Sequence, residues 1–192
     1  MKLLKKIGAG ILAASTLIWA FPPKALSQPV KPLTEARDGQ HDFDFNIGTW
    51  RTHIKRILDP LSGSPSSIEL NGTVTVRKVW GGRAQLEEIE ADGPNGHWEG
   101  MTLFLYNPRA RQWSQSFVNS KSGVLAAPLI GAFQDGRGEL FASDTVNDRS
   151  ILVRAVWSDI TPDSHHFEES YSTDGGKTWA AAFIATLTRD KP

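Results

Sequence analysis

Short β-type stretches alternate with explicit turn signals along most of the chain, and this pattern constrains its fold most strongly. The stretches are rich in Val, Ile, Thr, Phe and Trp, and clusters of Gly, Pro, Asn and Asp separate them. Glycine and Asn supply positive φ and proline supplies a fixed φ, so each cluster suits a tight reversal. No segment sustains a helical period. The sequence therefore predicts an antiparallel all-β domain.

About ten strands are expected, with only Asp42 to Ile47 suited to a short turn of helix. Strands at this spacing build either a sandwich or an up-and-down barrel. The predicted strands are Thr49 to Leu58, Ile68 to Val79, Ala84 to Ala91, His97 to Tyr106, Gln112 to Ser120, Val124 to Phe133, Gly138 to Thr145, Ile151 to Trp157, His165 to Ser172 and Ala180 to Arg189.

The segment that precedes the first strand favours the barrel. Phe43, Phe45 and Ile47 come just before Gly48-x-Trp50, and a strand starts at once. An aromatic turn can plug one end of a barrel, while Gly48 lets the backbone bend and Trp50 covers the floor of the core. We expect these residues to close one end of the barrel.

This segment resembles the opening of lipocalin-like (calycin) barrels. More narrowly, it is similar to an exported bacterial calycin-like family of unknown function that opens with F-D-F-x-x-G-x-W. The resemblance continues to Arg189 and implies a barrel with no established activity. Its further motifs are Gly82-x-x-x-Leu86-Glu87-Glu88, Gly100, Tyr106-Asn107-Pro108, Trp113 and Ser172-Thr173-Asp174-Gly175-Gly176-Lys177-Thr178-Trp179.

The N-terminus has the three parts of a secretory signal. Residues 1–6 carry three lysines, residues 7–21 are uncharged and apolar, and Ala25-Leu26-Ser27 offers a small-x-small cleavage site. An uncleaved membrane anchor is the alternative, but the apolar stretch is shorter than the roughly 20 residues that span a bilayer. We expect a signal peptide over 1–27, an extended lead-in over 28–40 and one domain over 41–192. The mature protein would be periplasmic or secreted.

Charge and cysteine content exclude several classes of function. The chain has no cysteine, which excludes a disulfide scaffold, a zinc finger, an iron–sulfur cluster and a thiol nucleophile. Loss of Lys2, Lys5, Lys6 and Lys24 with the signal reduces 21 basic residues to 17 against 21 acidic ones, a formal charge of −4. This charge argues against nucleic acid as a partner. No second long apolar run follows, so no stable membrane insertion is expected after cleavage.

The segment from Ser172 to Trp179 fits the Asp-box pattern S-x-D-x-G-x-T-W of sialidase propellers. A glycosidase is one interpretation. Propellers need several such boxes, however, and this chain has one. The favoured interpretation is structural: Asp174 accepts backbone N–H groups across a hairpin turn, Gly176 takes positive φ, and Trp179 folds under the hairpin.

The histidines give no metal-binding pattern. Adjacent strand residues face opposite sides of a sheet, so His165 and His166 cannot reach one metal from one strand. No H-x-H or H-E-x-x-H spacing occurs, and no cofactor is predicted. One face of this strand carries His166, Glu168 and Ser170. The other face, with two aromatic residues, is the better interior candidate and carries His165, Phe167, Glu169 and Tyr171.

The glutamates of the third predicted strand allow two interpretations. Leu86, Glu88 and Glu90 share one face, and Gln85, Glu87 and Ile89 share the other. Two glutamates on one side could form an acid and base pair, as in glycoside hydrolysis. A charged face that points to solvent is the ordinary explanation, and we favour it.

An aromatic and amide lining is the strongest functional signal. Trp98, Gly100, Thr102, Phe104 and Tyr106 alternate on one side of their strand, and Trp113, Gln115, Phe117 and Asn119 do so on the next. Large aromatics with a few fixed amides suit a pocket for a mostly apolar small molecule. Plain core packing is the alternative, although a barrel of about ten strands can leave a cavity.

The sequence thus predicts an exported calycin-like barrel that binds a small hydrophobic or amphipathic ligand. Burial against aromatic rings would provide affinity, and Gln115 or Asn119 would orient the ligand. An alternative is an isomerase, cyclase or hydrolase that uses the barrel as a reaction chamber, with Glu168 or His166 as base. A haem-binding barrel is a third, although the G-x-W-x-G-x-G glycines of such barrels are missing. The predicted ligand-binding residues are Trp98, Trp113, Gln115, Phe117, Asn119 and Trp157.

Overall fold

The structure, a computed structural model, describes residues 37–190. The predicted signal peptide and most of the lead-in lie outside these residues. Ten strands and two 3-10 turns make up the described part, and within it no helix has the length and hydropathy needed to cross a membrane. The elements are η1 (Asp44–Asn46), β1 (Gly48–Leu58), β2 (Ser66–Val79), η2 (Trp80–Gly82), β3 (Ala84–Gly93), β4 (Gly96–Asn107), β5 (Gln112–Asn119), β6 (Leu129–Gln134), β7 (Arg137–Val146), β8 (Arg149–Ser158), β9 (Ser164–Ser172) and β10 (Ala180–Arg189).

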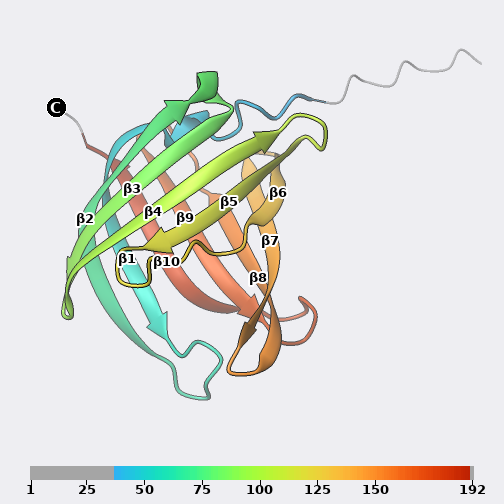
Figure 1. Ribbon diagram of the computed structural model, residues 1–192. Coiled ribbons are helices and arrows are strands. Elements are labelled where there is room, and N and C mark those ends of the chain that lie inside the picture. Colours follow the sequence, from blue (N-terminus) through green and yellow to red (C-terminus); the bar gives the residue numbers. More distant parts are fainter. Residues whose placement is uncertain (1–36, 191–192) are drawn as a thin grey trace, which may run out of the picture. The chain divides into compact units, whose positions relative to one another are not determined.

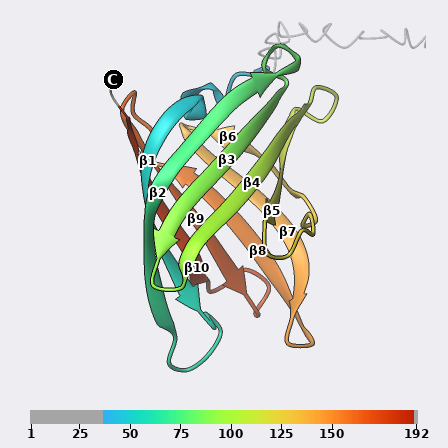
Figure 2. The same cartoon turned by 60° about the vertical axis from the view of Figure 1, so that its left-hand side comes forward.

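The strands form a closed up-and-down barrel (Figures 1 and 2). Each strand pairs antiparallel with its neighbour in the chain, and β1 pairs with β10 from Trp50↔Arg189 to Arg56↔Phe183. Alternation places one residue in two on the inner face, as the buried positions Trp50, Thr52 and Ile54 of β1 illustrate. The predicted all-β barrel and its short N-terminal helical turn are confirmed, and the sandwich is excluded.

Two tight hairpins follow the predicted turn chemistry. Asp135 and Gly136 join β6 to β7, and Asn147 and Asp148 join β7 to β8. All four residues have positive φ, between 50° and 77°. Two-residue loops of this kind match the right-handed twist of the strands they connect. These turns therefore fix the register of β7 against both neighbours.

The sixth strand is shorter than the predicted Val124 to Phe133. It begins only at Leu129, and β5 pairs with β6 solely through Trp113–Gln115 and Leu129–Gly131. Pro128 has no N–H to give to a sheet, and proline also restricts the residue before it. The preceding segment is tied to β5 by a single sheet-like bond from Ala126 N to Phe117 O, at 2.8 Å. The strand therefore starts just after the proline.

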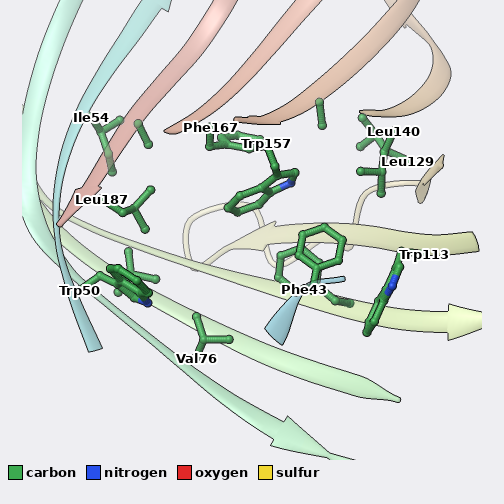
Figure 3. Close-up of a cluster of buried hydrophobic side chains, with 14 of the residues drawn as sticks. Phe43, Trp50, Ile54, Val76, Trp113, Leu129, Leu140, Trp157, Phe167 and Leu187 are labelled. Carbon is green, nitrogen blue, oxygen red and sulfur yellow. The ribbon is translucent and has the colours of Figure 1, made fainter. Parts of the chain in front are cut away.

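Aromatic side chains from η1 and its flanks fill one end of the barrel (Figure 3). Phe43 is fully buried, and its ring centroid lies 4.8 Å from Phe104, 5.2 Å from Trp113 and 5.5 Å from Trp157. In Figures 1 and 2 this end lies opposite the β1–β2 loop. Edge-on and tilted ring pairs of this kind stabilise a core beyond their buried area. We call this region, defined by residues 38–46 and the rings they contact, the plugged end.

The junction between η1 and β1 requires glycine. Gly48 has φ +122°, and an added Cβ would lie 2.7 Å from Nη1 of Arg189. The Arg189 guanidinium lies 3.9 Å from the ring centroid of Trp50 and donates to the carbonyl oxygens of Pro162 and Ile47. Trp50 in turn donates from Nε1 to Asn46 O at 2.8 Å. The first and last strands are thus fastened together at the plugged end.

The Asp-box segment forms the turn between β9 and β10. Asp174 Oδ1 accepts the backbone N–H groups of Lys177 and Thr178, each at 3.0 Å, and Thr178 Oγ1 donates to Oδ2 at 2.6 Å. These donors, led by Thr178, lower the pKa of Asp174 to about 2. Gly176 has φ +87°, and Trp179 Nε1 donates to its carbonyl oxygen. The carboxylate holds the turn, as the structural interpretation predicts.

Candidate ligand-binding cavity

The barrel interior contains a cavity of about 430 Å³ that extends to the end where the β1–β2 loop lies. Its deep part is formed by residues next to the plugged end, and its outer part by the last residues of β1 and the loop that follows. Aromatic and aliphatic side chains supply most of the lining: Ile54, Ile57, Leu58, Pro60, Val74, Ile89, Trp98, Phe117, Trp157, Phe167, Tyr171, Ala182, Phe183, Ala185 and Leu187. Eight polar or charged residues complete it: Thr52, Arg56, Asp59, Glu87, Thr102, Gln115, Asn119 and Glu169.

Five of the six predicted ligand-binding residues line this cavity, namely Trp98, Gln115, Phe117, Asn119 and Trp157. The sixth, Trp113, lies outside the lining. It is buried in the plugged end, against Phe43, and donates from Nε1 to Gly39 O at 2.8 Å. The structure thus gives Trp113 a place in the core, and contact of the other five with a ligand stays a prediction.

The predicted sharing of one face by β4 and β5 is present in the register. Thr102 pairs with Phe117, Phe104 with Gln115, and Tyr106 with Trp113. Gly100 makes room on this wall, because an added Cβ would lie 2.8 Å from both the Trp98 and Phe117 rings. These two rings are stacked, with centroids 5.9 Å apart and planes 20° apart. The result is a flat aromatic wall inside the cavity.

The opposite wall is also aromatic. Phe167 lies 4.7 Å from Trp157 and 6.1 Å from Phe183, measured between ring centroids. Phe183 also approaches Trp98, at 6.4 Å, so the rings continue around the interior. A space bounded by rings on both sides suits a flat, mostly apolar molecule.

The amides of the lining are partly engaged. Gln115 Oε1 accepts from Trp157 Nε1 at 3.1 Å, which fixes both side chains at the deep end of the cavity. Asn119 Oδ1 accepts from Ser122 N at 3.0 Å, in the turn that follows β5. Both amides lie on β5, and Gln115 is the one at the deep end, where it can contact a molecule inside the barrel.

A buried carboxyl faces the cavity and was not predicted as a site residue. Glu87 is 4% exposed; Thr102 Oγ1 donates to its Oε1 at 2.8 Å, and Asn46 Nδ2 to its Oε2 at 3.3 Å. Burial raises the pKa of Glu87, although both hydrogen bonds oppose the shift. The outward glutamates Glu88 and Glu90 are exposed, as expected for a solvent face. The signal for Glu87 was its alternation with Gln85 and Ile89 on the other face.

A second polar group lies on β9. Tyr171 Oη donates to Glu169 Oε1 at 3.0 Å, and both residues line the cavity. Burial is the main cause that raises the pKa of Glu169, and it also raises the pKa of the Tyr171 phenol, with the Glu169 charge second. Arg56 lines the cavity near the β1–β2 loop and acts on Tyr171 in the opposite direction.

His165 belongs to the plugged end, and its neighbour His166 faces outward. The His165 ring lies 4.4 Å from Trp50 and 5.1 Å from Phe45, and neither ring nitrogen has a hydrogen-bond partner. Burial lowers its pKa to about 3, with the charges of Arg189 and His166 adding to the effect. Glu168 and His166 are both absent from the cavity lining. The prediction that Glu168 or His166 serves as the base of an enzyme in the barrel is therefore wrong, because neither side chain reaches the cavity.

No metal centre is present in the described part of the chain. Within residues 37–190, no group of three or more His, Asp or Glu side chains is arranged to hold an ion.

The solved structures give one comparison that bears on the fold. The S-type phycobiliprotein lyase CPES from Guillardia theta matches with a TM-score of 0.56 and 17% identity, over 82% of this chain and 95% of that one. The barrel is calycin-like. At this identity the likeness concerns the fold alone. No protein-family model matches the chain, and no curated protein matches it by sequence.

Two further barrels align more loosely with this calycin-like barrel. EF1p2_mFAP2b bound to DFHBI matches with a TM-score of 0.45, and the redesigned β-barrel mFAP0 bound to DFHBI with 0.43, each at 10% identity. They cover 79% and 76% of this chain and 99% of their own. Likeness at that level adds nothing to the assignment of the fold.

Proposed function

We propose that the protein binds a small hydrophobic or amphipathic molecule inside its barrel. The supporting observation is the cavity of about 430 Å³, which has aromatic walls and a mostly apolar lining and lies beside the plugged end. This volume falls in the range of ligand pockets, roughly 300–1,000 Å³. The residues proposed to contact the ligand are Trp98, Phe117 and Trp157, with Gln115 as a fixed polar group.

Filling the cavity tests this proposal. Ala185 is buried and lines the cavity from β10, while Thr186 beside it is exposed on the outer face. Ala185→Phe should weaken binding of the neutral fluorescent probe N-phenyl-1-naphthylamine at least tenfold, and Thr186→Phe should leave it unchanged. Thermal unfolding of both variants checks that the barrel is intact.

Identification of the natural ligand is a complementary measurement. Organic extracts of protein purified without denaturation should contain a small apolar compound by mass spectrometry, and extracts of Ala185→Phe should contain much less of it. Equal binding of the probe to the wild type and Ala185→Phe, together with an empty extract, would contradict the proposal.

We further propose that residues 1–27 are a cleaved signal peptide and that the barrel acts in the periplasm or outside the cell. The basic segment, the uncharged stretch and Ala25-Leu26-Ser27 support this. We also propose kinship with the exported calycin-like family that opens with F-D-F-x-x-G-x-W. This proposal rests on the motifs between residues 43 and 189 that resemble that family. N-terminal sequencing of the mature protein should begin at Gln28, and an intact Met1 in the exported fraction would contradict cleavage.

A further inference from the structure

Glu87 is a carboxyl at the deep end of an aromatic cavity, and no described residue supplies it with a positive partner. Within residues 37–190, no lysine, arginine or histidine pairs with it, and its two hydrogen bonds come from the neutral groups of Thr102 and Asn46. Buried carboxylates are ordinarily paired with a cation, because an isolated charge in an apolar interior is costly. The missing partner is what a ligand could supply.

The position of Glu87 allows a ligand to reach it. In the register of β3, β4 and β5, Glu87 lies beside Thr102, and Thr102 lies beside Phe117. One step toward the β3–β4 turn the same wall has Ile89, Gly100 and Asn119. The carboxyl and the aromatic wall therefore face the same space, and a ring stacked on Phe117 would bring a short substituent to Glu87.

The neighbouring amide can serve the carboxyl in both of its charge states. Asn46 donates from Nδ2 to Glu87 Oε2, while its own Oδ1 is buried and has no partner. A half-turn of this amide would direct Oδ1 toward Glu87, where it would accept a hydrogen bond from the O–H of the neutral acid. An ionised carboxylate would keep the present arrangement. The site can therefore hold Glu87 neutral when empty and ionised when a cation arrives.

We propose that the ligand is an amphipathic molecule with a basic nitrogen, whose ammonium or amidinium group pairs with Glu87 at the deep end of the cavity. This inference rests on the proposed function and names its ligand class. Aromatic walls add to the attraction of a cation, because ring faces are negative. Arg56 is the only basic side chain among the described residues that line the cavity, and it lies near the β1–β2 loop, away from this group.

Three molecules with one ring system and different charges test the proposal: 1-naphthylmethylamine, 1-naphthylmethanol and 1-naphthoate. At neutral pH the amine is positively charged, the alcohol is neutral and the carboxylate is negatively charged, while the naphthalene ring is the same in all three. Calorimetric titration of the wild type should show the amine binding about tenfold to a hundredfold tighter than the alcohol, the range expected for a hydrogen bond to a charged group. The carboxylate should bind more weakly than the alcohol.

The variant Glu87→Gln should reduce the affinity for the amine to that for the alcohol, and leave the alcohol unchanged. Gln keeps one oxygen that can accept from Thr102, and its Nε2 can donate to Asn46 Oδ1 after a half-turn of that amide. Glu87→Leu is a second variant that removes the polar group altogether. The matched control is Glu88→Gln, because Glu88 is the next residue on β3 and points to solvent. It should keep the full preference for the amine.

The affinity for the amine should also rise with pH as Glu87 ionises, because only the ionised carboxylate pairs with the ammonium group. The other titratable groups of the lining are Asp59, Glu169, Tyr171 and Arg56, and Glu87→Gln separates the contribution of Glu87 from theirs. The affinity of Glu87→Gln for the amine should rise less with pH than that of the wild type.

The outcomes distinguish this inference from the proposed function. Binding of the alcohol without a preference for the amine overturns the inference and leaves the proposed function standing. Retention of the preference in Glu87→Gln or Glu87→Leu also overturns the inference, since another group must then hold the cation. Absence of binding by all three molecules contradicts both.

Discussion

At the plugged end the barrel interior is filled with rings, whereas toward the β1–β2 loop it contains a cavity of about 430 Å³. The same strands build both halves and alternate in the same way. The difference comes from residues 38–46, which add Phe43 and Phe45 to one end, while no described segment fills the other. The walls of such a barrel therefore leave room for a ligand wherever a capping segment does not occupy it.

The two halves also bury opposite kinds of titratable group. The plugged end contains His165, whose pKa burial lowers to about 3, and the cavity contains Glu87, whose pKa burial raises. In each case burial disfavours the charged form of the side chain. The histidine is sealed among rings, whereas the carboxyl faces a space that a ligand can enter. Buried groups of this kind are stability determinants at the plugged end and candidate binding groups in the cavity.

The largest expected effect is acid lability that originates at the plugged end. His165 has a folded pKa of about 3 against 6.5 unfolded, so the unfolded chain binds more protons between these values. The stabilisation is complete above pH 6.5 and is lost as the pH falls toward 3, with an upper bound of about 5 kcal/mol. His165→Leu should flatten the dependence of the unfolding free energy on pH in this window. Urea unfolding from pH 7 to pH 4 measures it.

An outward histidine provides the control for that experiment. His166→Leu changes the neighbouring residue on β9, which is absent from the interior lining, and should leave the acid dependence close to that of the wild type. If His165→Leu and the wild type lose the same stability between pH 6.5 and pH 4, the buried histidine does not set the acid limit.

The next effect compares a ring of the plug with a ring of the cavity wall. Phe43→Ala removes a fully buried ring that contacts several others and should cost about 3–5 kcal/mol of unfolding free energy. Phe183→Ala removes a half-buried ring beside an existing cavity and should cost about 1–2 kcal/mol, because fewer contacts are lost. Binding of N-phenyl-1-naphthylamine should respond in the reverse order. Equal costs in urea unfolding would mean that the cavity is packed in solution.

Much of the fold could be predicted from the sequence because strand alternation and turn chemistry are local. Asn147-Asp148 and the aromatic turn before Gly48-x-Trp50 were both interpretable without neighbours. The start of β6 was predicted too early, because Val124 and Leu125 are residue types that favour strands. Pro128, which has no N–H to donate, prevents regular sheet pairing before Leu129. Alternation thus gives the face of a residue, while the limits of a strand depend on which N–H groups have partners.

The site was less predictable because its depth in the barrel depends on distant segments. Trp113 and Phe117 share a face of β5, but residues 38–46 cover only the first of them. Alternation could place Glu87 on the face opposite Glu88, but its role depends on its partners Asn46 and Thr102, which come from η1 and β4. Whether an inward-facing residue packs in the plugged end or lines the cavity depends on tertiary structure. The spacing of residues along one strand cannot predict it.

The smallest expected effect is a difference in stability between variants of two glycines, one at the start of β1 and one in the loop that follows it. Gly48→Ala at the plugged end should cost about 1–3 kcal/mol, because φ is +122° and the new methyl group would meet Arg189. Gly63→Ala lies in the β1–β2 loop, where an added Cβ has no atom within 4 Å, and should be neutral or stabilise by about 0.4–1 kcal/mol through the unfolded chain. Thermal and urea unfolding of the two variants measure the difference. A Gly48→Ala protein as stable as Gly63→Ala would show that the clamp of Arg189 over Trp50 can give way without loss, and the plugged end would then be no more tightly constrained than the loop at the mouth of the cavity.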